Sequence, residues 1–217
     1  MGLLRDRVFR ESRLQRRPFG IALACLMFLA VCHGGIGGMT ANAVPPSGPD
    51  GPVVLFDFDD AAAVAAWTTV NDPVMGGKST SSIRFGDGGL EFSGTVSLEN
   101  NGGFASARSP QDPDLGRRAA GANSLRVHAA GDGKTYLLKL STVGQPWSYI
   151  QRFPTEAGVG RIYDLPVDGF RPVGMRLDPA PNAPQTLDPS TISGVSIYIL
   201  DKQQGPFEIT VTAIDAT

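Results

Sequence analysis

The chain has 217 residues and a formal net charge of −2, a length that suits one domain or two small ones. Apolar residues make up 41% of the sequence and charged residues 18%, so the chain can build a core and is not a charged disordered polymer. Its 27 glycines and 17 prolines are about a fifth of all residues, against about 12% on average, which excludes a helical bundle or a coiled coil.

The charge is unevenly distributed along the chain. Residues 1–43 contain six arginines and two acidic residues, whereas residues 44–217 contain 13 basic and 19 acidic residues, a net charge of −6. Phosphate contacts need clustered positive charge, and the acidic body has no such cluster in its sequence. We therefore expect no nucleic-acid partner.

Residues 1–43 have the three parts of a cleaved export signal. An arginine-rich start precedes an uncharged apolar run, Phe19–Cys32, which is shorter than the ~20 residues that cross a bilayer as a helix. The small-residue sequence Ala41-Asn42-Ala43 then provides a cleavage site. The pattern predicts a periplasmic or cell-envelope protein, with a mitochondrial presequence as the alternative. Only an uncleaved leader would attach it to a membrane.

Two details of this segment matter for the mature protein. The pair Arg16-Arg17 leaves both general and twin-arginine export open. Cys25 and Cys32, the two cysteines of the chain, both lie before the cleavage site. The mature chain would therefore have no disulfide and no thiol chemistry.

Residues 44–52 are a Pro/Gly-rich linker by composition, and residues 53–217 are expected to form one domain. Apolar and polar residues alternate in several of its segments, which is typical of strands with one buried and one wetter face. The clearest are residues 90–99, 125–129, 195–199 and 207–213. The pattern predicts an all-β fold, an antiparallel β-sandwich of the jelly-roll type, with a closed barrel as the alternative.

Short punctuating sequences support this interpretation. Gly-Asp-Gly occurs at residues 86–88 and 131–133, and the second lies between two β segments as a hairpin turn would. The one helical candidate is Asp60 to Ala66, a short alanine-rich segment that Asp60 could cap.

The mature sequence lacks the usual catalytic constellations. It has one histidine, His128, on the outward face of an expected strand, and no G-x-S-x-G motif, dinucleotide fingerprint or P-loop. We therefore predict no enzymatic activity and no cofactor. Asp57, Asp59 and Asp60 are interpreted as a turn or cap, with a calcium site as the alternative. Catalysis through Asp57, Asp59 or Asp72 is the remaining enzymatic alternative.

Two motifs with paired glycines stand out. They are WTTVNDPVMGGKS, residues 67–79, and LENNGGFASAR, residues 98–108. Glycine permits backbone angles and close approaches that other residues do not, and Asn or Asp can bond turn amides. The residues of interest are Trp67, Asn71, Asp72, Met75, Gly76, Gly77 and Ser79 in the first motif, and Asn100, Asn101, Gly102, Gly103, Phe104 and Arg108 in the second. From the residues alone, both motifs are interpreted as complex turns.

With the later segments 131–136 (GDGKTY) and 205–207 (GPF), these motifs closely resemble the complex I intermediate-associated protein 30 family. The resemblance covers residues 53–214 and keeps the motif order. It implies a galactose-binding-domain-like jelly roll and a non-enzymatic role in holding or assembling other proteins. Members of this family are assembly factors of the NADH:ubiquinone oxidoreductase, so the resemblance implies a protein partner.

The segment PWSYIQRF, residues 146–153, has two faces if it is a strand. One face would carry Trp147, Tyr149, Gln151 and Phe153, and the other Ser148, Ile150 and Arg152. The aromatic face either points into the core or lies open, stacking on sugar rings or anchoring a partner. The second interpretation makes the chain a carbohydrate-binding module as the alternative function. Its candidate binding residues are Trp147, Tyr149, Gln151, Arg152 and Phe153.

Overall fold

The structure is a computed structural model that describes residues 51–217. The predicted export signal, with Cys25 and Cys32, lies outside the described residues, as does the linker up to residue 50. Within the described part of the chain, no helix has the length and apolar character needed to cross a membrane.

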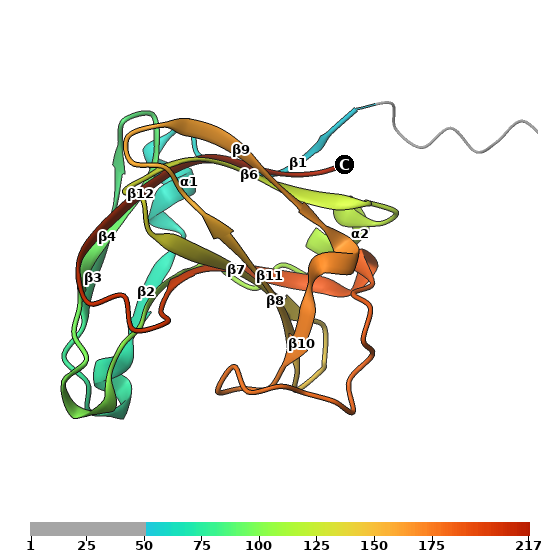
Figure 1. The fold of residues 1–217 in the computed structure, drawn as a ribbon. Coiled ribbons are helices and arrows are strands. Elements are labelled where there is room, and N and C mark those ends of the chain that lie inside the picture. Colours follow the sequence, from blue (N-terminus) through green and yellow to red (C-terminus); the bar gives the residue numbers. More distant parts are fainter. Residues whose placement is uncertain (1–50) are drawn as a thin grey trace, which may run out of the picture. The chain divides into compact units, whose positions relative to one another are not determined.

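Two six-stranded sheets make up the fold (Figure 1). Sheet A has the order β3-β4-β12-β6-β9, with β1 also paired to β12, and sheet B has the order β10-β8-β7-β11-β5-β2. All of these strand pairs are antiparallel. The predicted antiparallel β-sandwich is therefore confirmed, and the closed barrel is wrong because the strands form two separate sheets.

The strands of sheet A are β1 (Val53–Asp57), β3 (Thr80–Gly86), β4 (Gly89–Val96), β6 (Ser124–Gly131), β9 (Gly160–Pro166) and β12 (Gly205–Ala216). Those of sheet B are β2 (Thr68–Asn71), β5 (Ala105–Arg108), β7 (Thr135–Thr142), β8 (Ser148–Pro154), β10 (Arg171–Val173) and β11 (Ile192–Ile199). The helical elements are α1 (Ala61–Ala65), α2 (Leu115–Ala119), η1 (Asp72–Met75), η2 (Glu99–Asn101), η3 (Val167–Gly169) and η4 (Pro189–Thr191).

The core lies between the facing sides of the two sheets. Its large, fully buried side chains include Phe58, Phe92, Tyr136 and Phe153. Trp67 of the first motif also belongs to it and packs edge-on against Phe58, with ring centroids 5.2 Å apart. Aromatic rings in this geometry add to the free energy gained from burying their area.

The turns differ in part from the prediction. Asp87 and Gly88 both have positive φ, 49° and 73°, and close a tight hairpin between β3 and β4. Residues 131–133 do not form the expected hairpin, because β6 belongs to sheet A and β7 to sheet B. The Asp132 carboxylate anchors this crossover by accepting hydrogen bonds from the Tyr136 hydroxyl at 3.1 Å and the Glu208 amide at 3.2 Å.

The predicted helix is confirmed in α1, which Asp60 caps. Its carboxylate accepts hydrogen bonds from the amides of Ala62 at 2.7 Å and Ala63 at 2.8 Å. The calcium alternative is not supported, because within residues 51–217 no three His, Cys, Asp or Glu side chains are grouped to hold a metal ion. Asp57, Asp59 and Asp60 therefore lie in a strand end and a capped turn.

Candidate functional site

Asp72 joins the two glycine motifs into one structural unit. Strands β2 and β5 pair side by side, so the turns that adjoin them meet at the same corner of sheet B. The fully buried Asp72 carboxylate accepts hydrogen bonds from the Ser79 amide at 2.8 Å and from the Ser79 hydroxyl. It also accepts from the amides of Gly103 at 2.6 Å and Phe104 at 3.2 Å. We call Asp72, Gly77, Ser79, Gly102 and Gly103 the Asp72 corner.

The charge of Asp72 is stabilised by these donors. Burial alone would raise the pKa of its carboxyl, but the hydrogen bonds from Ser79, Gly103 and Phe104 outweigh burial and lower that pKa below its usual value. A carboxylate that accepts four hydrogen bonds has little capacity left to take up a proton from a substrate. Asp72 is therefore a structural residue, and the hydrogen bonds to its carboxylate do not fit a catalytic base.

The two glycines of each pair have different roles. A Cβ on Gly77 would lie 2.3 Å from Asp72 Oδ1, and one on Gly102 would lie 2.6 Å from Asp72 Oδ2, so both positions must leave room for the carboxylate. Gly76 and Gly103 instead have φ angles of +91° and +133°, which disfavour a side chain. The motif therefore combines close approach with unusual backbone angles.

The asparagines of the motifs complete the turns. Asn100 and Asn101 have positive φ, 55° and 59°, and the Asn100 side-chain amide donates to the Gly76 carbonyl at 3.1 Å. Asn71 is hydrogen-bonded to Ser81. Met75, by contrast, is 64% exposed at the end of η1. Most motif residues thus build a corner, which matches their interpretation as complex turns.

The aromatic face of β8 points into the core. Tyr149 and Phe153 are buried in the main core, and Trp147 packs against it half-buried. The Tyr149 hydroxyl donates to the Pro184 carbonyl at 2.9 Å. Neither Tyr149 nor Phe153 offers an open ring face, so the core interpretation holds for both. Gln151, on the same side of the strand, lines a pocket instead.

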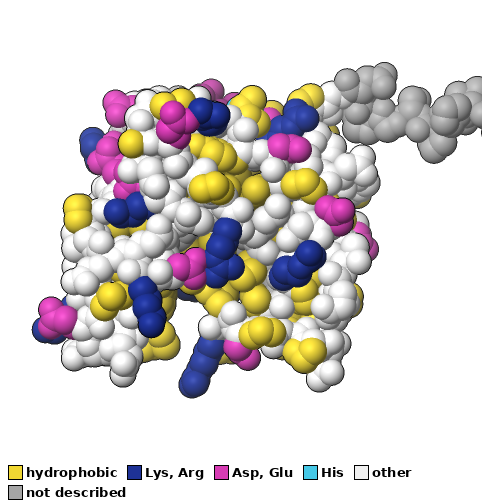
Figure 2. All heavy atoms as spheres, viewed as in Figure 1, with side chains coloured by type: hydrophobic (Ala, Val, Ile, Leu, Met, Phe, Trp, Pro, Cys, Tyr) yellow, Lys and Arg dark blue, Asp and Glu magenta, His cyan; other side chains and the backbone are white. Residues whose placement is uncertain are grey.

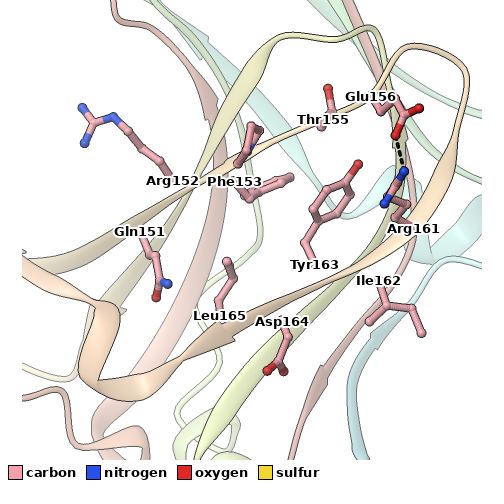
Figure 3. A pocket seen from close by; sticks show the side chains of 11 residues that line it. Gln151, Arg152, Phe153, Thr155, Glu156, Arg161, Ile162, Tyr163, Asp164 and Leu165 are labelled. Atoms are coloured by element: carbon pink, nitrogen blue, oxygen red, sulfur yellow. Dashed lines mark hydrogen bonds and ion pairs between the residues drawn. The ribbon is translucent and has the colours of Figure 1, made fainter.

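This pocket lies where β8 and β9 diverge (Figure 3) and has a volume of about 530 Å³. Residues 151–156 and 161–165 line it, and a Glu156–Arg161 ion pair stands at its rim. Two buried polar atoms in its lining, Gln151 Oε1 and the Tyr163 hydroxyl, have no hydrogen-bond partner among the described residues. Both atoms are themselves buried, so they lie behind the surface of the pocket and do not open onto it.

A second surface lies on the side of sheet B that faces away from sheet A. Strand pairing places residues in rows across this face, because directly opposite residues of antiparallel strands point the same way. One row holds Arg152, Leu137, Tyr198, Ser106 and Val70. The next holds Arg171, Ile150, Lys139, Ser196, Arg108 and Thr68. We call these two rows, with the apolar residues packed beside them, the outer face.

The outer face is unusually apolar for a sheet side that no second layer covers. Leu137, Ile150, Val173 and Tyr198 form a buried cluster, against which Phe104, Leu177 and Leu200 pack. In Figure 1 the space below β7, β11 and β8 is flanked by β2 on one side and β10 on the other. Figure 2 shows a notch at this place, with hydrophobic and basic side chains beside it. The sequence alternation predicted a wetter face here.

Two half-buried cations converge on Tyr198 in this face. The Arg108 guanidinium lies over the Tyr198 ring, 5.4 Å from its centroid, and the Lys139 ammonium lies 5.9 Å from it. Arg108 Nη2 also donates to the Tyr198 hydroxyl at 2.8 Å, and Nε donates to Ser106 Oγ at 3.0 Å. Burial and the neighbouring Arg108 lower the pKa of Lys139, and burial raises the pKa of Tyr198.

Arg152 is the one predicted β8 candidate on the outer face, and it has a partner. Its guanidinium binds both Asp201 carboxylate oxygens, at 2.7 and 2.8 Å. Arg108 was singled out through its motif, but Lys139, Tyr198 and Leu137 were missed. Leu137 and Lys139 are two positions apart in β7, and Tyr198 is on the neighbouring strand β11. The alternation within each strand could have shown that these side chains share a sheet face, but not that β5 pairs with β11 and adds Arg108 to it.

Comparison with known proteins places the chain in a family. The sequence model of complex I intermediate-associated protein 30 matches residues 56–211. No curated protein matches. The family 11 carbohydrate-binding module of the cellulosomal cellulase Lic26A-Cel5E of Clostridium thermocellum has a TM-score of 0.54 at 17% identity, covering 76% of this chain and 94% of the module.

A second structure, the family 11 carbohydrate-binding module from Clostridium thermocellum in complex with a β-1,3-1,4-mixed-linked tetrasaccharide, has a TM-score of 0.53 at 16% identity, with the same coverage. At these identities the likeness shows a shared fold, a β-sandwich. The sequence match spans most of the chain and includes both glycine motifs. This protein therefore belongs to the complex I intermediate-associated protein 30 family.

Proposed function

We propose that this protein is a non-catalytic, exported binding module that holds a protein partner during assembly, with the outer face of sheet B as its binding surface. Family membership supports the assembly role. The observation that carries the choice of surface is a group of half-buried apolar side chains, Phe104, Leu177 and Leu200, that pack on the buried cluster of an uncovered sheet face. The apolar area that these side chains still expose gains free energy when a partner excludes water from it.

The exposed tip of the first motif fits a protein partner as well. Val74 and Met75 are 71% and 64% exposed, although they are adjacent and apolar. Methionine adapts to irregular surfaces and is common where proteins bind several partners. The acidic residues considered for catalysis, in contrast, cap α1, end β1 or are enclosed by backbone donors.

Site-specific photo-crosslinking in the source cells tests this proposal. A photoreactive amino acid replaces Thr68 or Ser148, which lie on the outer face, and Arg126 on the outer side of sheet A serves as the matched control. We expect one recurring protein adduct from Thr68 and Ser148, recovered with the periplasmic and envelope fractions, and none from Arg126. Adducts from Arg126 alone, or from no position, would contradict the proposal.

The pocket between β8 and β9 favours a second candidate function, carbohydrate binding. The exposed polar side chains that line it, among them Glu156, Arg161 and Asp164, would bond sugar hydroxyls. A structurally similar module is described in complex with a mixed-linked tetrasaccharide. Calorimetric titration with that tetrasaccharide tests this candidate. If no heat of binding is detected at millimolar concentration, the protein does not bind this sugar.

Two tyrosine variants separate a used hydroxyl from an unused one. We expect Tyr163→Phe to leave the free energy of unfolding unchanged or to raise it by up to about 1 kcal/mol, because the buried hydroxyl has no partner. We expect Tyr149→Phe to lower it by about 1 kcal/mol, since the Pro184 carbonyl loses its donor. Denaturant unfolding measures both, and equal effects would refute the assignment.

A further inference from the structure

We propose that the outer face recognises a carboxylate between Arg108 and Lys139, supplied by an acidic side chain of an extended protein segment. The inference rests on the proposed function and names the chemistry of the partner. It is carried by the positions of the two cations, by their lack of acidic partners and by the apolar cluster beside them.

Arg108 and Lys139 are among the cations of the described chain that have no acidic partner, and they are the two that lie over one ring, that of Tyr198. Within residues 51–217, no carboxylate lies within 4.0 Å of either, whereas Arg126 and Arg152 pair with Asp164 and Asp201. Both side chains are half-buried. Two like charges held together away from water repel each other, and an anion placed between them removes that cost. The positive site stands out because residues 44–217 carry a net charge of −6.

The spacing of the two cations suits one carboxylate. Lys139 and Arg108 occupy the same row on β7 and β5, with Ser196 of β11 between them. Their backbones are therefore two strand spacings, about 10 Å, apart. Both charged ends lie over the neighbouring Tyr198 ring, 5.4 and 5.9 Å from its centroid. Arg108 has five N–H groups, of which Nε and Nη2 contact Ser106 and Tyr198, so donors remain for a ligand.

The apolar cluster explains why we infer a protein segment and not a small anion. Leu137 and Tyr198 lie in the row next to that of Lys139 and Ser196, two residues away along β7 and β11. That separation is about 7 Å, the distance between residues i and i+2 of an extended peptide. Leu137 and Tyr198 are themselves buried, so an apolar residue two positions before the acidic one would lie over this row and pack against the half-buried Phe104 beside Tyr198.

The test uses a synthetic octapeptide, Gly-Ser-Leu-Thr-Glu-Thr-Gly-Ser, titrated into the isotope-labelled protein and followed by amide chemical shifts. We expect shifts centred on Ser196, Tyr198 and Lys139, and affinity at least about tenfold weaker for the same peptide with Gln in place of Glu. Arg108→Gln and Lys139→Gln should each weaken binding by a similar factor. Arg108→Lys, which keeps the charge, should retain part of the affinity, and Arg126→Gln should retain all of it.

Three results would overturn the inference. They are equal binding of the Glu and Gln peptides, binding of trigalacturonate without binding of the peptide, and shifts centred outside the outer face. Crosslinking separates this failure from failure of the proposed function. If an Arg108→Gln/Lys139→Gln variant crosslinks its partner as the unaltered chain does, the carboxylate site is wrong and the binding module stands. If the peptide binds but Thr68 and Ser148 yield no adduct, the carboxylate site stands and the assembly role fails.

Discussion

Asp72→Ala is expected to lower the free energy of unfolding by about 3–5 kcal/mol, because four donors at the Asp72 corner lose their acceptor in a buried position. Ser79 and the turn of the second motif would then be held by strand pairing alone. Urea unfolding monitored by tryptophan fluorescence measures the loss, since Trp67 lies in the adjoining core. Asp59→Ala, at an exposed position whose backbone lies outside the left-handed region, serves as a control for removing a surface carboxylate.

The same carboxylate should make stability depend on pH in a defined direction. The pKa of Asp72 is lowered in the folded state, so the unfolded chain takes up the proton first as pH falls. The stabilisation is present above the ordinary Asp value, about 3.9, and is lost as pH falls through the lowered native pKa. The difference in free energy of unfolding between the unaltered protein and Asp72→Asn should therefore become smaller as pH falls below about 4.

The pH comparison isolates Asp72 from the other acids. Asp112, Asp164 and Asp201 also have lowered pKa values, through hydrogen bonds or ion pairs, and they contribute with the same sign in both proteins. Their contribution cancels in the difference between the two curves. A difference that stays constant from pH 7 to pH 2 would show that the Asp72 charge is not what holds the corner.

Gly77→Ala and Gly102→Ala are each expected to destabilise the protein by about 2–4 kcal/mol. Their new Cβ atoms would lie 2.3 and 2.6 Å from Asp72 oxygens, so the carboxylate must leave its donors. Gly76→Ala is the matched neighbour: nothing lies within 4 Å of its Cβ, and only its φ of +91° opposes a side chain. That variant should cost about 1–2 kcal/mol.

The order of these effects distinguishes crowding from backbone strain. Thermal and urea unfolding of all three variants should rank Gly77 and Gly102 above Gly76. If Gly76→Ala is the most destabilising variant, the glycines are needed mainly for their backbone angles, and the close approach of Gly77 and Gly102 to Asp72 matters less. Combining Gly77→Ala with Asp72→Ala should cost less than the sum, because the second change removes the atoms that the first one meets.

The sequence identified the strands of this fold better than it identified the connections between them. Period-two alternation is a local property, and β4, β6, β11 and β12 appear where it predicts them. The segment 131–133 was misread as a hairpin because turn residues do not reveal whether the next strand returns to the same sheet. That choice depends on contacts such as the hydrogen bond between Asp132 and the Glu208 amide, whose residues are 76 positions apart in the chain.

The binding surface was harder to predict for a related reason. The aromatic residues of β8 are conspicuous in the sequence, yet Tyr149 and Phe153 face the core. Burying these large rings stabilises the fold relative to leaving them in water. Lys139, Tyr198 and Arg108 come from three strands that pair only in the folded sheet. No local pattern brings them together. Phe104 and Arg108 were found through their motif, but their position on the outer face depends on the register of β5.

The order of strands in sheet A has a consequence for biosynthesis. β12 (Gly205–Ala216) pairs with β1, β4 and β6, so a late segment of the chain joins strands made long before it. Sheet A cannot close until residue 216 has left the ribosome. Until then the edges of β4 and β6 that β12 will cover stay unpaired, and chaperones can engage such open strand edges.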